Sequence, residues 1–249
     1  MLCLPRCCAA LFLSIAAAAF PAQDFHGVWP SGVSRPWAGP EYWANPLQDW
    51  RIRGGRLENF VPGGDRNVFL LTREINARPG SLDMSVTLGR LEGDTTPLGD
   101  GFVGFRVGIR GYFRDYRDSA VRGEGLNAGM ASDGRLFVGK LEAHAAKVAP
   151  PFRNIVLRLR AEPDGANYRV DLDARSSDGR ALAALSAGNL PASWFTGGIA
   201  LVCSSGTVAA SPPEAEMIPG FGQKRSTERG GTLRFWFRDW RVSGTKLDV

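Results

Sequence analysis

Apolar and polar residues alternate along most of this chain, with the period of two that marks a β-strand with one buried face. The stretch 155–160, which reads Ile-Val-Leu-Arg-Leu-Arg, is the clearest example. Runs of this kind are separated by short segments rich in Gly and Asp, which are typical of turns. They predict roughly a dozen strands, at residues 49–57, 67–75, 82–88, 102–109, 126–130, 136–141, 155–160, 168–173, 180–185, 199–203 and 233–242.

This spacing of strands and turns predicts an all-β fold, an antiparallel β-sandwich of the jelly-roll type. Helix signals are nearly absent, because residues 143–148 form too short a run and residues 191–194 allow one turn at most. No shift in composition divides the sequence. We therefore expect a single sandwich domain over residues 24–249. Its first part, residues 24–48, is rich in Trp, Gly and Pro and is predicted to be an ordered loop.

The N-terminal segment predicts secretion. Arg6 precedes an apolar stretch at residues 9–20, which is about half the length needed to span a bilayer. Small residues follow, and the pattern is that of a signal peptide over residues 1–19, cleaved after Ala19 or as far along as Ala22. We expect a secreted or periplasmic mature chain. Its only cysteine is Cys203, so no internal disulfide is expected.

Two similar strings lie near the ends of the predicted sandwich. Residues 49–54 read Asp-Trp-Arg-Ile-Arg-Gly, and residues 239–244 read Asp-Trp-Arg-Val-Ser-Gly. Trp50 and Trp240 each alternate with charged neighbours, which favours a core position for both. We interpret the two strings as equivalent edge or neighbouring strands, placed so that the ends of the domain meet.

The charge pattern argues against nucleic-acid and membrane partners. The chain has 30 basic and 25 acidic residues, a net charge of +5. This excess is spread without a run of like charge, and Asp115 and Asp118 neutralise the densest arginine cluster. The two histidines, His26 and His144, belong to no zinc or two-metal motif. We expect no nucleic-acid binding, no membrane span and no phosphatase-type metal centre.

Catalytic motifs are equally sparse. Glycoside hydrolysis needs two carboxylates across the scissile bond, and Asp171 and Asp173 are the one pair spaced to share a strand face. They lack a third acid nearby, and a solvated sheet face beside Arg169 and Arg175 is the simpler interpretation. The sequence has no Gly-x-Ser-x-Gly elbow for a serine triad.

Two clusters suit ligand binding better. Aromatic residues gather in the predicted loop 24–48, and a polar-aromatic cluster spans 112–118. Such a charged cluster is more often a self-paired loop or a contact with a neighbouring domain. The candidate ligand-binding residues are Tyr42, Trp43, Tyr112, Arg114, Asp115, Tyr116 and Arg117.

The sequence has a short first strand (Asp-Trp-x-Ile-x-x-Gly-x-Leu-Glu), a long alternating meander and a closing Phe-x-Asp-Trp-x-Val-x-Gly. These three features resemble the concanavalin A-like lectin/glucanase superfamily, and within it the laminin-G-like domains of secreted bacterial proteins. That resemblance implies a sandwich that often holds one calcium through loop carboxylates. The candidates here are Asp94, Asp100 and Asp133, and no other cofactor is expected.

A narrower resemblance rests on longer strings at residues 41–50, 64–73, 113–123 and 133–136. They are similar to the N-terminal region of bacterial alkaline phosphatase D-type phosphodiesterases, where a sandwich precedes a metallophosphatase domain. This chain stops at Val249, where that domain would begin. We expect a secreted, non-catalytic module that binds carbohydrate or packs against a metallophosphatase partner domain. A glycoside hydrolase-like enzyme and a truncated phosphodiesterase remnant are the alternatives.

Overall fold

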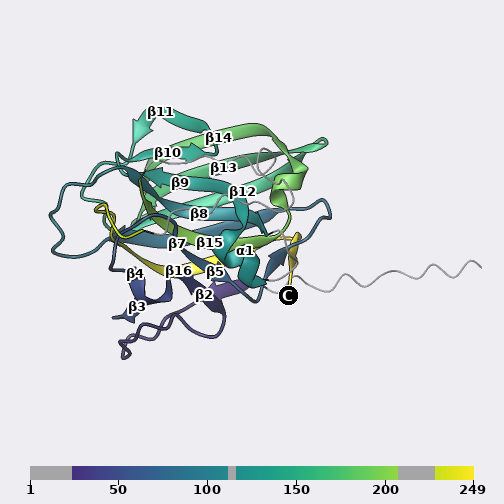
Figure 1. The fold of residues 1–249 in the computed structure, drawn as a ribbon. Helices are drawn as coiled ribbons and strands as arrows, with labels where there is room; N and C mark the ends of the chain where they lie inside the picture. The colour runs from purple at the N-terminus through teal and green to yellow at the C-terminus, as the bar shows by residue number, and fades with distance from the viewer. Residues whose placement is uncertain (1–23, 112–115, 207–227) are drawn as a thin grey trace, which may run out of the picture.

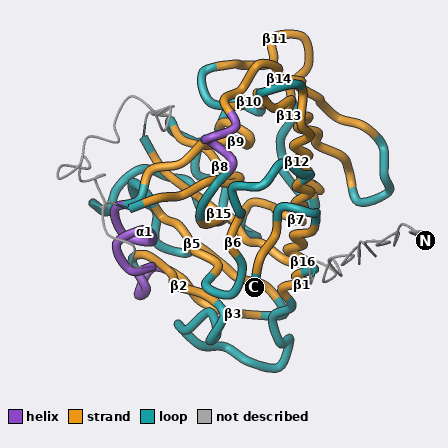
Figure 2. Tube along the Cα trace, turned by 90° about the vertical axis from the view of Figure 1, so that its right-hand side faces the viewer, coloured by secondary structure: helices purple, strands orange, loops and turns teal. Residues whose placement is uncertain are grey.

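The computed structural model describes residues 24–111, 116–206 and 228–249. The predicted signal peptide therefore lies outside the described residues. The described chain forms two large antiparallel sheets, which face each other as two layers in Figure 2. The predicted all-β antiparallel sandwich is confirmed.

The first sheet has eight strands. Its order is β14 (Ala181–Pro191), β13 (Asn167–Ser176), β12 (Ile155–Asp164), β7 (Leu82–Arg90), β16 (Phe235–Ser243), β4 (Arg56–Asn59) and β3 (Trp50–Arg53), with β1 (Phe25–Gly27) also paired to β16.

The second sheet has seven strands. Its order is β11 (Leu141–Lys147), β10 (Arg135–Val138), β9 (Glu124–Ala131), β8 (Gly101–Arg110), β15 (Gly198–Ser205), β5 (Arg66–Leu70) and β2 (Tyr42–Asn45). A separate ladder joins β6 (Glu74–Ile75) to β17 (Leu247–Asp248).

The core lies between the two sheets, because the apolar residues of each alternating strand point inward. One continuous cluster of buried side chains runs from Phe25 to Leu247 and includes Trp50 and Trp240, both fully buried. The core positions predicted for these two tryptophans are confirmed. Asp239, at φ +52, marks a β-bulge in β16, and the shift in register turns both Phe237 and Trp240 toward the core.

The two similar end strings are arranged differently from the prediction. β3 is an edge strand, and β4 separates it from β16. The N-terminal partner of β16 is instead β1, through pairs such as Phe25 with Val242. The two ends of the described fold do meet, but the first strand of the sandwich makes the contact.

Residues 24–48 are mostly loop, as predicted, but they also contain two short strands that the sequence analysis did not predict, β1 and β2. A 3-10 turn, Leu47–Asp49, begins at the end of the segment. These strands are three and four residues long, which is too short to show an alternating pattern in the sequence. Burial of Phe25, Trp29 and Tyr42 fixes them against the sandwich.

A helix also forms where the sequence shows little helix signal. Helix α1 (Tyr116–Arg122) lies on the outer side of the seven-stranded sheet, over β2, β5 and β8 (Figures 1 and 2). Its buried Ala120 packs with Phe69, Ile109 and Ala200. A helix of two turns that buries one small residue leaves no apolar periodicity to detect.

Most predicted turns form as expected. Gly54 and Gly55 both have positive φ, +57 and +73, and close the hairpin between β3 and β4. The predicted strand 67–75 is divided into β5 and β6. The turn at 192–195 is a 3-10 helix. None of the described helices has the length and apolar character needed to cross a bilayer.

Candidate functional site

A groove lies on the outer face of the eight-stranded sheet. The pairing register of the strands forms its floor. Arg51 pairs across the sheet with Glu58, Glu58 with Trp236, and Trp236 with Gly89, so one row of outward positions crosses β3, β4, β16 and β7. The loop after β7, residues 91–95, borders this row and completes the groove.

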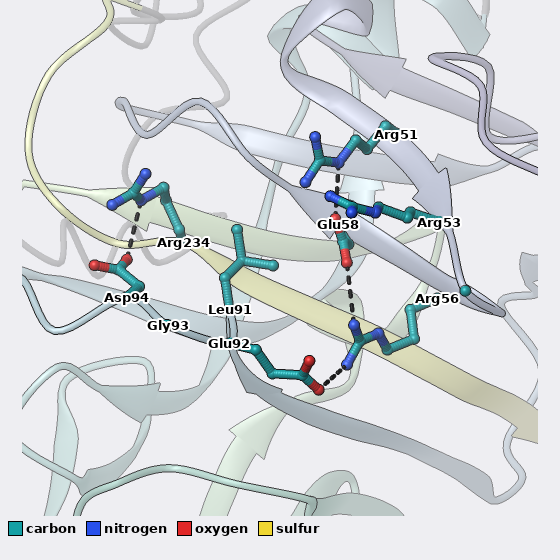
Figure 3. Close-up of a pocket in the computed structure, with 10 residues that line it drawn as sticks. Arg51, Arg53, Arg56, Glu58, Leu91, Glu92, Gly93, Asp94 and Arg234 are labelled. Carbon is teal, nitrogen blue, oxygen red and sulfur yellow. Dashed lines mark hydrogen bonds and ion pairs between the residues drawn. The ribbon is translucent and has the colours of Figure 1, made fainter.

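Two adjoining pockets of about 510 and 490 Å³ make up this groove, and both are lined by Arg56 and by the loop residues 91–94. We call them together the arginine groove. Figure 3 shows Arg51, Arg53 and Arg56 along one side, Asp94 and Arg234 opposite, and Leu91 between them. The charged residues lining the groove, among those described, are seven arginines (Arg51, Arg53, Arg56, Arg90, Arg153, Arg234 and Arg238) and three acids (Glu58, Glu92 and Asp94).

Two buried carboxylates hold four of these arginines in place. The Glu58 side chain is 3% exposed and accepts from Arg51 Nε at 2.8 Å and from Arg56 Nη2 at 3.4 Å. Asp94 is 4% exposed and accepts from Arg90 at 3.2 Å and from Arg234 at 3.0 Å. Because each of these two acids is shared by two guanidinium groups, its charge offsets only one of the two.

The third acid is exposed. Glu92 lies on the rim with 81% of its side chain accessible, and Arg56 Nη1 donates to its carboxylate at 2.9 Å. That hydrogen bond, with the charges of Arg56, Arg153 and Arg53, lowers the pKa of Glu92. At Asp94, burial raises the pKa, but bonds from Thr96 and Arg234 outweigh it and the net pKa is lowered. Both groups are therefore ionised at neutral pH.

Trp236 forms an aromatic floor beneath the guanidinium groups. Its indole lies over Gly89, where an added Cβ would come within 2.6 Å of the ring, so the strand needs glycine at this point. Arg56 and Arg238 stand over the ring at 5.1 and 5.6 Å. Trp236 is only 4% exposed, so it supports the arginines rather than offering an open face.

The sequence reasoning missed this groove. Its residues run from Arg51 to Arg238 and meet only through the strand order. The expectation that the positive charge is spread without a focus is wrong in space, although it holds along the sequence. One local signal was present. Trp236 is a large aromatic at an outward position of β16, between Arg234 and Arg238.

The aromatic candidates divide by burial. Tyr42 is 8% exposed and packs against Phe25 and Trp240, so it lies in the core and not on an open surface. Its neighbour Trp43 faces outward and is 37% exposed. The two do not form one surface, because successive side chains of a strand point to opposite faces.

The cluster at 112–118 lies only partly within the described chain. Tyr112, Arg114 and Asp115 fall outside the described residues. Tyr116 begins helix α1, and Arg117 follows it with an exposed side chain. Helix α1 lies over the seven-stranded sheet and the arginine groove on the other sheet, so Arg117 does not line the groove.

The two candidate catalytic acids lie on the outer face of β13, in a ladder of surface ion pairs. Asp173 accepts from Arg175 at 2.7 Å and lies 3.8 Å from Arg160. Asp171 accepts from Ser186 Oγ at 2.7 Å and lies 3.7 Å from Arg169. Both carboxylates are occupied by their neighbours on the sheet, as expected of a solvated face.

The candidate calcium ligands are separate. Asp94 belongs to the arginine groove. Asp133 is paired with Arg135 and Lys147, and Asp100 is exposed. The described residues contain no group of three His, Cys, Asp or Glu side chains able to hold a metal ion. The geometry described therefore adds no support for calcium.

A second polar cluster lies on the outer face of the seven-stranded sheet. Arg106 donates to Asp65 at 2.7 Å and to Asn127 Oδ1 at 2.8 Å, and Asn67 donates to the Asp65 carbonyl at 3.3 Å. All four residues are at most 5% exposed. Because they are buried, they form a structural network and not an open binding surface.

Comparisons with known proteins identify the fold. No family model matches the chain, and no curated protein matches its sequence. Among solved structures, lectin II from Ulex europaeus has a TM-score of 0.52 at 8% identity, covering 90% of this chain and 99% of the lectin. Peanut lectin with a nonapeptide gives 0.50 at 10% identity, covering 92% and 100%. The Lotus tetragonolobus seed lectin gives 0.50 at 9% identity, covering 87% and 100%. The chain thus has the concanavalin A-like β-sandwich fold of the legume lectins.

Proposed function

We propose that this chain is a secreted, non-catalytic β-sandwich module that binds carbohydrate in the arginine groove. The observation that carries the proposal is the groove itself: an open site on a lectin-type fold, with hydrogen-bonding groups already fixed by buried partners. Its volume lies in the range of small-ligand sites. Guanidinium and carboxylate groups along the groove suit the hydroxyl groups of a sugar, which both donate and accept hydrogen bonds.

The charges of the groove argue for binding rather than hydrolysis. A glycosidase needs one carboxylic acid that stays protonated near neutral pH, and its pKa is therefore raised. Here the pKa of Glu92 is lowered by Arg56. Burial raises the pKa of Asp94, but hydrogen bonds from Thr96 and Arg234 outweigh this effect and lower it. Glu58 is held between Arg51 and Arg56. Glu92 and Asp94 are therefore unsuited to the role of proton donor.

Titration of the purified protein against a panel of neutral and acidic polysaccharides tests this proposal. We expect saturable binding without release of reducing sugar. Leu91→Trp adds bulk between the two sides of the groove without changing its charge and should abolish binding. Leu141→Trp is the matched control, because Leu141 is exposed on β11, away from the groove. Binding that survives Leu91→Trp, or reducing sugar whose release is lost in Asp171→Ala, would overturn the proposal.

A second candidate function is packing against a partner domain, such as the metallophosphatase domain implied by the phosphodiesterase resemblance. The observation in its favour is a group of exposed apolar side chains. Of the seven large ones on the described chain, four (Val28, Trp37, Trp43 and Leu47) fall within residues 28–47. Paired substitution of Trp37 and Trp43 by Ser should then increase solubility and leave glycan binding unchanged.

A further inference from the structure

We propose that the arginine groove selects anionic glycans, whose uronate or sulfate groups bind its guanidinium edges. The inference rests on the proposed function and adds the chemical class of the ligand. The first observation is the net positive charge of the groove. The groove brings together seven arginines and three acids, whereas the whole chain has 30 basic and 25 acidic residues. Most of the net charge of the protein therefore lies at this one site.

The arginines are set in the geometry that anion recognition requires. Arg56 and Arg238 stand over Trp236, which supports both guanidinium groups from beneath. Of the two Nη atoms of Arg56, one donates to buried Glu58 and the other only to exposed Glu92, so a ligand anion that replaces Glu92 gains that donor. Glu58 and Asp94 orient Arg51, Arg56, Arg90 and Arg234 from below. A carboxylate or sulfate that meets a guanidinium edge forms paired, charge-assisted hydrogen bonds.

Two arginines at the rim have open hydrogen-bonding capacity. Among the described residues, the side chains of Arg53 and Arg153 have no hydrogen-bond or ion-pair partner. Both residues are exposed. Each is close enough to Glu92 to lower the pKa of its carboxyl. Arg53 lines one of the two adjoining pockets and Arg153 lines the other.

Glu92 occupies the place that a ligand anion would take. It is the one exposed acid of the groove, and a single hydrogen bond to Arg56 holds it there. A uronate or sulfate entering between Arg53, Arg56 and Arg153 would replace this carboxylate. The side chain of Glu92 thus competes with anionic ligands and has no such effect on a neutral sugar.

Four probes separate the outcomes, each titrated by calorimetry at two salt concentrations: oligogalacturonate, dextran sulfate, neutral dextran and a single-stranded DNA oligomer of matched charge. For oligogalacturonate or dextran sulfate, we expect Arg53→Ala to weaken binding about two- to fivefold and Glu92→Gln to strengthen it by a similar factor. Arg180→Ala is the matched control, an exposed arginine in the turn between β13 and β14, and should change nothing. Whichever of the two anionic glycans binds more tightly identifies uronate or sulfate as the recognised group.

Other results overturn the inference in distinguishable ways. If dextran binds as tightly as the anionic glycans and Glu92→Gln has no effect, the anionic class is wrong while carbohydrate binding stands. If no glycan binds, the proposed function itself fails. If the DNA oligomer binds at least as tightly as either glycan, the groove is a general polyanion site and glycan selection is refuted.

Discussion

Replacing Arg66 by Met removes one half of a fully buried ion pair. Arg66 Nη2 donates to Asp49 Oδ2 at 2.6 Å, and the two side chains are 0% and 1% exposed. After the change, Asp49 keeps one bond at 3.0 Å, from Arg229, whose side chain is 63% exposed. Breaking a buried pair costs about 3–5 kcal/mol, and an exposed partner offsets less than about 1 kcal/mol. We expect R66M to lower the free energy of unfolding by about 3–4 kcal/mol.

The double variant D49N/R66M removes both charges, so no uncompensated ion remains in the core. Between described residues, it still loses the bonds from Arg66 Nη1 to the carbonyls of Gly64 and Glu228, at 2.7 and 3.2 Å. At about 1 kcal/mol for each bond, the double variant should lose about 2 kcal/mol and be more stable than R66M.

Urea unfolding followed by tryptophan fluorescence measures both variants, because Trp50 and Trp240 are fully buried and report on the core. The wild-type free energy of unfolding is expected within about 5–15 kcal/mol, so R66M should show a clearly lower midpoint. A loss below about 1 kcal/mol in R66M, or a double variant less stable than R66M, would refute this reasoning.

Three further predictions concern Cys203, Asp133 and the N-terminal segment 1–19. Burial raises the pKa of Cys203 to about 12, so iodoacetamide at mildly alkaline pH should modify it only after unfolding in urea. Peptide mass spectrometry measures the labelling, and equal labelling of native and unfolded protein would contradict the prediction. At Asp133, burial raises the pKa, but hydrogen bonds from Lys147 and Arg135 outweigh it and hold the value at about 2, below the usual value of about 3.9. The stability that ionised Asp133 contributes is present above about pH 4 and is lost as the pH falls toward about 2. D133N should therefore lose less stability over that interval than the wild type. If urea unfolding at a series of pH values shows the same loss in both proteins, the prediction is wrong. Secretion through residues 1–19 predicts a mature N-terminus at Phe20, and intact-mass measurement of exported protein that retains Arg6 would exclude it.

The fold follows largely from local pattern. Alternation in strands such as 155–160, with Gly54 and Gly55 at a turn, needs no knowledge of distant residues, and these elements form as predicted. Short elements were missed for a physical reason. β1 and β2 each bury one or two side chains, and α1 buries the small side chain of Ala120. Tertiary packing, rather than propensity, therefore decides the structure of these elements.

The site depends on non-local arrangement. Arg51, Trp236 and Asp94 share one groove because β4 and β16 lie between β3 and β7, an order that no sequence period reveals. The sequence candidates instead followed local clustering. Tyr42 illustrates the limit of that approach: an aromatic in a Pro- and Gly-rich stretch resembles a binding loop until a strand places it in the core.

Hydrogen–deuterium exchange of the full chain, with and without saturating oligogalacturonate, tests the location of the binding site directly. The account predicts ligand-dependent protection at residues 51–58, 89–95 and 234–238, which line the arginine groove, and no change at the buried network of Asp65 and Arg106. Protection confined to the outer face of the seven-stranded sheet, at β8 and β9, with the groove unchanged, would contradict it.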